Sequence, residues 1–326
     1  MPPKIRGMAR NLTPSKSFTL MLSSEDALVS EDDRPVGNAP PKGLPHERFL
    51  LGNQVPVAPI LLLGQSNLAI NPDAIIAALQ PVHLHATRDH LILMQQNQVQ
   101  LNTADSSQLL KVALPLIEED FQSSLLFAGQ HDWFIEAGPF SSLASHSIDQ
   151  AHGRNIDWWM PRDTHEAGVA RSWRKLQNEI QMLWHIDPVN IERNEQGLPA
   201  INSVWISGIG KLADVKPPEA LQGAQRIFGS HPLLRGLARY LDIPYQTQLS
   251  IPTDLAGGFA WLDQPKSIWP KLKQALEDNK LQEMILIDFP KGQVRKRILT
   301  AKTLRKKSWA FWRQAQQLSW EEITQA

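Results

Sequence analysis

The sequence predicts an α/β domain with a parallel sheet, interrupted by an inserted α+β lobe. Strand-like and helix-like segments alternate after residue 210, which is typical of a parallel sheet. Residues 81–210 instead mix hairpin-like pairs with two long helical patterns. A chain of 326 residues, 42% of them hydrophobic, is large enough for two such bodies. We expect the α/β domain to comprise residues 56–80 and 211–326, and the lobe to comprise residues 81–210.

The composition excludes several classes of partner and site. Lys plus Arg and Asp plus Glu number 33 each, so there is no strong nucleic-acid signal. The absence of cysteine excludes disulfides, thiolate zinc sites and cysteine nucleophiles. The run Phe18–Leu22 is too short for a signal-peptide core, and no later run approaches a membrane span. We therefore expect a cytoplasmic protein with no membrane partner.

Residues 1–55 are expected to be a disordered lead-in. Nine of the 24 prolines fall before Ile60, among Ser, Asp, Glu and Gly and without apolar periodicity. The first strand is predicted at Pro59–Leu63, an apolar run closed by Gly64. Helical spacing is expected next, at Ile75, Ile76 and Leu79.

The lobe is predicted from alternating strand and helix signals. The expected strands are Val82–His85, Asp89–Met94, Gln98–Leu101, Ser124–Ala128, Asp132–Ala137 and Ile156–Met160. Helices are expected at Thr103–Glu119 and from Arg171 until Pro188 stops the pattern. After the lobe, helices are predicted at His231–Leu241, Lys266–Asp278 and Thr303–Leu318, with strands at Tyr245–Leu249 and Glu283–Phe289.

A polar cluster between residues 178 and 210 is a candidate anion site. It contains Asn190, Arg193, Asn202, Gly208 and Gly210. Arginine offers a forked set of donors, and a glycine turn exposes backbone N–H groups, so a phosphate or carboxylate would fit. The alternative is structural: the asparagines satisfy loop backbone, and the arginine pairs with a nearby acid such as Glu179.

Two further polar groups have competing interpretations. Asp163 and His165 would suit an acid–base or phosphate-contacting pair, or would cap a helix that begins near Gly168. His83 and His85 share one face of a predicted strand, but only Asp89 offers a carboxylate nearby. We therefore predict no metal site there.

The C-terminal segment is strongly basic. Nine basic residues and no acid lie between Lys291 and Trp320, with Trp309, Phe311 and Trp312 among them. Residues 291–313 would suit an acidic protein partner. The alternative is a helix with a solvated basic face, whose tryptophans dock on the body of the protein.

Several segments of the chain together resemble a known family. Asp187–Arg193, Gly197–Asn202 and Ser207–Gly210 have the order and spacing of the inserted domain of archaeal-type cofactor-independent phosphoglycerate mutases, in the alkaline-phosphatase-like superfamily. Asp163–Gly168 and Pro232–Arg239 are similar to two flanking segments of that family. The resemblance covers about residues 80–245 and is closer still to a bacterial group of regulatory and uncharacterised proteins, the Rpf-type pathogenicity-factor regulators. It implies a reduced alkaline-phosphatase-like fold.

The departures from that family decide the functional prediction. The active mutases use a serine between two divalent metals, Mn or Mg. Here the predicted first strand ends Leu63-Gly64-Gln65-Ser66 without an aspartate, His231 is the only histidine after His185, and Ser207 replaces an arginine. We therefore expect a non-catalytic relative without a cofactor, with a regulatory role or a role in binding a phosphorylated small-molecule metabolite. Two alternatives remain open. One is an active phosphoglycerate mutase or phosphatase that uses Asp163, His165 and Arg193, and the other is a partner-binding module that uses the basic C-terminal helix.

Overall fold

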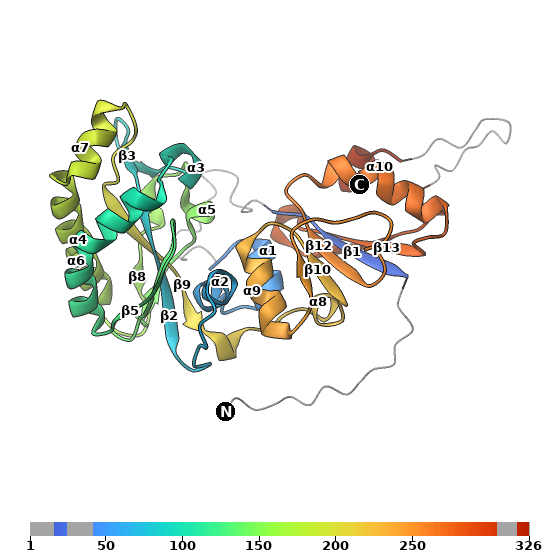
Figure 1. Cartoon of the computed structure of the whole chain (residues 1–326), viewed down its shortest axis with the longest axis horizontal. Helices are drawn as coiled ribbons and strands as arrows, with labels where there is room; N and C mark the ends of the chain where they lie inside the picture. The colour runs from blue at the N-terminus through green and yellow to red at the C-terminus, as the bar shows by residue number, and fades with distance from the viewer. Residues whose placement is uncertain (1–15, 25–41, 305–317, 326) are drawn as a thin grey trace.

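A computed structural model describes residues 16–24, 42–304 and 318–325. They form an α/β domain around a six-stranded, mostly parallel sheet and an α+β lobe around a separate antiparallel sheet. The two bodies lie side by side, with helix α2 between them (Figure 1). The predicted fold class is confirmed. None of the helices in this part of the chain is long and apolar enough to cross a membrane.

In the six-stranded sheet, the spatial order of the strands differs from their order along the chain. From edge to edge it runs β11 (Tyr245–Gln246), β10 (Arg226–Phe228), β12 (Gly258–Trp261), β1 (Ser17–Met21), β13 (Glu283–Asp288) and β14 (Arg295–Leu299). All neighbours are parallel except β14, which pairs antiparallel to β13. Helices cover both faces, as a parallel sheet requires.

Strand β1 corrects the prediction of a disordered lead-in. It lies inside the sheet, where Phe18 pairs with Gly258 on one side and Met284 on the other. Phe18 and Leu20 are fully buried. Residues Pro45–Leu51 form a further ordered element, helix α1. The prediction failed because the strand partners of β1 lie more than 230 residues away, so nothing local marks the five residues as a core strand.

The apolar run at Pro59–Leu63 belongs to helix α2 (Val57–Gln65), so the predicted strand there is wrong. Ile60 and Leu63 pack into the core of the α/β domain, whereas Ala58 and Leu62 pack on the lobe sheet with Phe134. A helix buried on both sides is apolar all round, and a short apolar run cannot separate it from a buried strand.

Helix α9 (Pro232–Leu241) crosses α2 at a close contact that requires glycine. A Cβ at Gly236 would lie 1.9 Å from the carbonyl oxygen of Ile60, and one at Gly64 would lie 2.4 Å from that of Pro232. The two backbones therefore touch where both helices carry glycine.

The remaining helices complete the two layers of the α/β domain. Helices α1, α8 (Glu219–Gln222) and α9 pack on the face that carries Met21 and Phe259. Helices α10 (Pro265–Glu277) and α11 (Trp320–Gln325) pack on the face that carries Phe18 and Leu20. The predicted elements at 231–241, 266–278 and 283–289 are confirmed. The predicted helix at 303–318 falls mostly on residues 305–317, outside the described residues.

The lobe sheet is antiparallel, in the order β5 (Leu125–Ala128), β6 (Trp133–Glu136), β2 (Ile75–Val82) and β9 (Ser203–Lys211). The predicted hairpin of β5 and β6 is confirmed. The helical spacing expected at 75–79 is wrong, because these residues form β2. Strand β2 is buried on both faces, so it lacks the polar alternation that would mark a strand. The lobe therefore includes residues 75–80, which we had assigned to the α/β domain.

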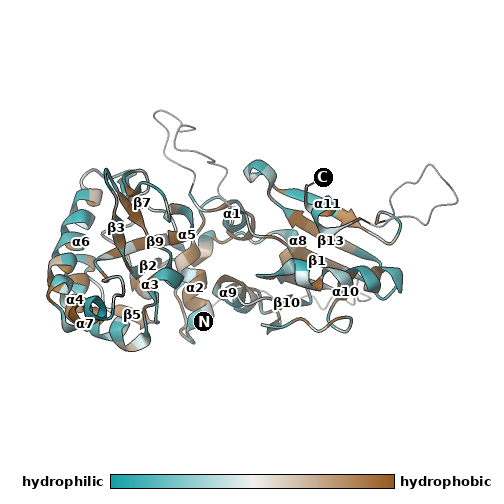
Figure 2. Ribbon diagram, turned by 90° about the horizontal axis from the view of Figure 1, so that it is seen from above, coloured by the Kyte–Doolittle hydropathy of each residue, from teal (hydrophilic) through white to brown (hydrophobic). Residues whose placement is uncertain are grey.

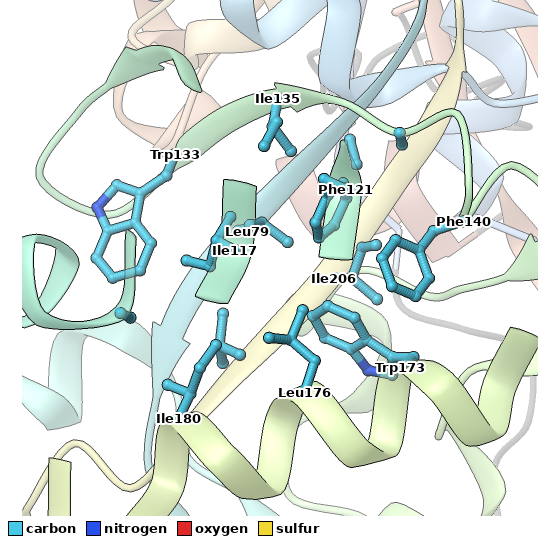
Figure 3. Packing of buried hydrophobic residues seen from close by; sticks show 14 of the residues in the cluster. Leu79, Ile117, Phe121, Trp133, Ile135, Phe140, Trp173, Leu176, Ile180 and Ile206 are labelled. Atoms are coloured by element: carbon cyan, nitrogen blue, oxygen red, sulfur yellow. The ribbon is translucent and has the colours of Figure 1, made fainter. Parts of the chain in front are cut away.

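Two long helices, α4 (Thr103–Phe121) and α6 (Val169–His185), enclose the core of the lobe against its sheet (Figure 3). Phe121, Phe140 and Trp173 make edge and tilted ring contacts there. The outer surface of α6 is hydrophilic (Figure 2). The shorter elements are β3 (Leu84–Ala86), β4 (Leu91–Leu93), α3 (Gln96–Val99), β7 (Leu143–Ala144), α5 (Ile148–Ala151), β8 (Arg162–Asp163) and α7 (Pro188–Glu195). The predicted strands at 98–101 and 156–160 are wrong, since the first begins inside α3, which ends at Val99, and the second holds a 3-10 turn at Ile156–Trp158.

Candidate functional site

The predicted anion-binding asparagine, Asn190, is a buried structural residue. Its Nδ2 donates to the carbonyl oxygens of Trp184 and Ile201, both at 2.8 Å, and its Oδ1 accepts from the Ile201 N–H at 2.7 Å. The side chain is 2% exposed. It therefore joins the end of α6 to the chain entering β9, as the structural interpretation of this loop expected.

Arg193 is also engaged within the lobe. Its guanidinium donates to the carbonyl oxygens of Pro199 and Val99 and forms an ion pair with Asp105 at 3.2 Å. The side chain is 2% exposed. The arginine thus ties α7 to the start of α4. Its acidic partner is Asp105 rather than Glu179, which lies 3.6 Å from Lys175.

The other members of the cluster serve the packing of β9. Asn202 accepts the Leu84 N–H with its Oδ1 and donates from its Nδ2 to the Leu84 carbonyl. These two bonds join the chain entering β9 to the start of β3. A Cβ at Gly208 would lie 2.6 Å from the Ala58 nitrogen, and one at Gly210 would lie 2.6 Å from Pro56. These glycines let the start of α2 approach the strand, and Ser207 donates to Gln80 at 2.8 Å. Their backbone surface is occupied by α2.

Asp163 caps helix α6. Its carboxylate accepts from the Gly168 N–H at 2.8 Å and the Ala170 N–H at 2.6 Å. These bonds hold the pKa of Asp163 below its usual range. His165 is exposed. This geometry matches the capping interpretation, and the structure does not bring Asp163 and Arg193 into one site.

The histidines of the early hairpin do not gather ligands. His83 bonds through Nδ1 to the carbonyl of Ala200 at 2.7 Å, and burial lowers its pKa. Its ring lies 5.8 Å from that of His85. Nowhere in residues 16–24, 42–304 and 318–325 do three or more His, Cys, Asp or Glu side chains gather as a metal site would need.

A polar cavity lies where the lobe meets the carboxyl ends of the parallel strands. Its volume is about 430 Å³. The α/β domain contributes residues that follow β1, β10 and β12, together with the start of α1, and the lobe contributes residues in and after α5. The lining consists of Ser23, Ser24, Leu44, His46, Asp149, His152, Arg154, His231, Trp261 and Asp263. Crevices at the carboxyl edge of an open α/β sheet, and between domains, are the usual places for ligands.

His46 contributes a buried imidazole to this cavity. The ring is 6% exposed. Its Nδ1 accepts from the Ser24 N–H at 3.2 Å and lies 3.0 Å from the Ser24 hydroxyl. An Nδ1 that accepts a backbone N–H carries no proton, so the neutral ring carries its hydrogen on Nε2. Burial, with a smaller effect of nearby His231, lowers the pKa of His46 to about 4.

His231 has the same tautomer for the same reason. It caps α9, and its Nδ1 accepts from the Leu233 N–H at 3.1 Å, which leaves the hydrogen on Nε2. The ring stacks on Trp261 with centroids 4.3 Å apart, and His46 lies on the same indole at 4.9 Å. The indole N–H donates to Ser23 at 2.8 Å. Among the described residues, neither Nε2 has a hydrogen-bond partner, so the cavity holds two oriented N–H donors.

Charged side chains flank these donors. Asp263 accepts from the Ser230 hydroxyl at 2.6 Å, and Asp149 is exposed on α5 of the lobe. Arg154 lies 5.1 Å from the Trp159 ring centroid. Burial lowers the pKa of His231, and the carboxylates of Asp149 and Asp263 partly oppose this effect.

The two metals that the family resemblance implies do not fit the described donor set. The residues after β1 are Leu22, Ser23 and Ser24, and both histidines use Nδ1 for backbone bonds while their rings lie on Trp261. The absence of an aspartate had been inferred from residues 63–66, which form the end of α2 rather than a first strand. Glu25 and Asp26 come next in the sequence, outside the described residues.

A second cavity of about 430 Å³ lies at the start of α6. Asp120, Glu166 and Lys175 are among its lining residues, and burial raises the pKa of Asp120. We favour the cavity between the lobe and the α/β domain, because both of its imidazole donors are fixed in orientation and that of His46 is buried.

Sequence reasoning missed most of this cavity. His46 lies in the segment that is predicted to be a disordered lead-in, and the sequence singles out His231 only as the last histidine of the chain. One signal was present: the apolar run Phe18–Leu22 is followed at once by two serines, as expected where a buried strand ends at a site.

The described part of the basic segment forms the edge strand β14. Arg295 and Arg297 both bind the carboxylate of Asp288, whereas Lys296 and Ile298 are exposed. Residues 305–317, which carry Trp309, Phe311 and Trp312, lie outside the described residues.

Comparison with known proteins gives a distant structural similarity. No family model and no curated protein matches the sequence. The structure is similar to a cofactor-independent phosphoglycerate mutase from Thermoplasma acidophilum DSM 1728, with a TM-score of 0.37 and 13% identity over 84% of this chain and 86% of that one. It is also similar to the PH0037 protein from Pyrococcus horikoshii, with a TM-score of 0.39 and 13% identity over 85% and 82% of the two chains. Both similarities are distant, and they leave the activity of the chain open.

Proposed function

We propose that this chain is a non-catalytic, regulatory protein that binds a small metabolite with an acidic group, a phosphate or a carboxylate, between its two lobes. The observation that carries the proposal is the pair of histidine rings held as N–H donors in the cavity at the carboxyl edge of the sheet. An oxyanion accepts hydrogen bonds from such donors.

The state of the two rings favours binding over proton transfer. Both Nδ1 atoms accept backbone N–H groups, and a pKa of about 4 makes His46 a weak base at pH 7. The competing hypothesis is a mutase or phosphatase. The residues proposed for it, Asp163, His165 and Arg193, are a helix cap, an exposed loop residue and a buried structural arginine. An enzyme would therefore need a different set of groups.

A thermal-shift screen of phosphorylated and carboxylated metabolites tests the binding proposal. We expect at least one hit, which His231→Asn weakens and Asp89→Asn leaves unchanged. Asparagine retains an acceptor for the Leu233 N–H and removes the Nε2 donor, whereas Asp89 is exposed on the early hairpin. If the thermal shift of a compound is the same in His231→Asn as in the unchanged protein, the ligand binds elsewhere. Turnover of 3-phosphoglycerate with Mn²⁺ or Mg²⁺ would refute the non-catalytic part.

A second candidate function is the binding of an acidic protein through residues 291–313. The observation in its favour is that β14 is an edge strand with Lys296 and Ile298 exposed, and edge strands are ready templates for pairing. We expect Lys296→Glu to weaken retention on immobilised poly-L-glutamate, whereas Lys175→Glu on α6 does not. Equal retention of the two variants would count against this function.

A further inference from the structure

The ligand class follows from the donors and charges of the cavity between the lobes, and this inference rests on the proposed binding function. The cavity contains His46, which is more than nine-tenths buried and whose Nε2–H has no acceptor among the residues that the structure describes. The half-buried His231 supplies a second N–H donor, and its ring contacts the same Trp261 indole as that of His46. Both donors are uncharged, so they match an acceptor oxygen without adding positive charge.

The formal charges around these donors are unbalanced. Among the described lining residues, Asp149 and Asp263 carry one negative charge each and Arg154 carries one positive charge, which gives −1 with both imidazoles neutral. The two carboxylates come from different lobes, and both act on His231. A phosphate dianion would bring two further negative charges into this environment, which Coulomb repulsion opposes.

The geometry points to an amino-acid-like zwitterion as the ligand, with its carboxylate on the two imidazole N–H donors and its ammonium group facing the carboxylates of Asp149 and Asp263. The carboxylate accepts the hydrogen bonds that the two imidazole rings offer. The ammonium group neutralises the excess negative charge, and hydrogen bonds to charged groups are the stronger ones. The volume of about 430 Å³ is within the usual range for small-molecule sites.

Calorimetry on the full-length protein tests the inference with matched compounds. The nineteen amino acids with a primary ammonium group are titrated singly. Each is compared with the 2-hydroxy acid that differs from it only by a hydroxyl in place of the ammonium group, and 3-phosphoglycerate is a third probe. We expect at least one amino acid to bind, and its hydroxy acid to bind at least about tenfold more weakly.

Two variants test the assigned contacts. Asp263→Asn removes the charge and retains an oxygen for Ser230, so we expect about a tenfold loss of affinity for the amino acid. His231→Asn should weaken the amino acid as well, and Asp89→Asn should change nothing. Circular dichroism of each variant confirms that it is folded.

The outcomes separate the two proposals. If a hydroxy acid or 3-phosphoglycerate binds as tightly as any amino acid, or if Asp263→Asn has no effect, the zwitterion inference is wrong while metabolite binding stands. If no acid-bearing compound binds, both proposals are wrong.

Discussion

Replacing Arg193 by alanine should destabilise the lobe severely and leave ligand binding in the cavity unchanged. The Arg193 side chain is 3% exposed, and its guanidinium satisfies the carbonyls of Pro199 and Val99 as well as the carboxylate of Asp105. A hydrogen bond from a charged donor contributes about 1.5–3 kcal/mol, and the carbonyls of Val99 and Pro199 lose their donor in the variant. Breaking a fully buried ion pair costs about 3–5 kcal/mol, and the Arg193–Asp105 pair should contribute less than this because the Asp105 side chain is 23% exposed. We therefore expect the free energy of unfolding to fall by about 3–5 kcal/mol, a large part of the stability of an ordinary domain.

The assay is urea denaturation followed by circular dichroism, with Arg174→Ala as the matched control. Arg174 is an exposed arginine on α6, so its loss should change the free energy of unfolding by less than about 0.5 kcal/mol. Arg193→Lys keeps the charge but loses the fork and should fall between the two. A loss below about 1 kcal/mol for Arg193→Ala would refute the structural role. So would normal stability combined with lost metabolite binding, which is the result that an anion site at Arg193 would give.

Three further predictions concern pH and packing. The pKa of His46 is about 4 in the folded chain and 6.5 in its ordinary state, so only the unfolded chain takes up this proton between those pH values. The free energy of unfolding should therefore fall by about 3 kcal/mol from pH 6.5 to 4. His46→Gln should reduce this pH dependence in denaturant titrations. Gly236→Ala places a methyl group 1.9 Å from the Ile60 carbonyl oxygen and should lower the free energy of unfolding by about 3 kcal/mol. Gly138→Ala, with open space around its Cβ, should change this free energy little. Equal melting temperatures of the two variants would contradict the close crossing of α2 and α9. Asp163→Ala should destabilise α6 more at pH 7 than at pH 3. The lowered pKa of Asp163 means that its carboxylate stabilises the fold and that this stabilisation is lost when the carboxylate is protonated. An equal effect at both pH values in thermal melts would argue against this role of Asp163.

The sequence predicted the elements that carry a clear periodic pattern. Helix α10 and strand β13 follow each other in the chain and carry the usual periodic patterns, and both are confirmed. The sequence analysis missed strand β1 and predicted a strand where helix α2 lies. A five-residue apolar run has the same pattern in a core strand, in a helix between two layers and in an irregular segment. Only tertiary contacts decide among these.

The same distinction explains the candidate site. Asn190 and Arg193 attracted attention because polar residues cluster around them, yet that cluster exists to satisfy backbone groups where three elements meet. His46 and His231 stand 185 positions apart and meet only because β1 and β10 end at the same edge of the sheet. A short-range motif search therefore finds the loop and overlooks the cavity.

Helix α2 has a consequence for how the molecule unfolds and moves. Its two sides belong to two different cores, one around α9 and one on the lobe sheet. Rotation of the lobe about this helix would expose apolar surface in one core or the other, and neither half retains a complete core when the chain is cut on either side of residues 57–65. The two halves should therefore melt as a single cooperative unit, and ligand entry should depend on side-chain rearrangement at the cavity mouth more than on a hinge between rigid domains.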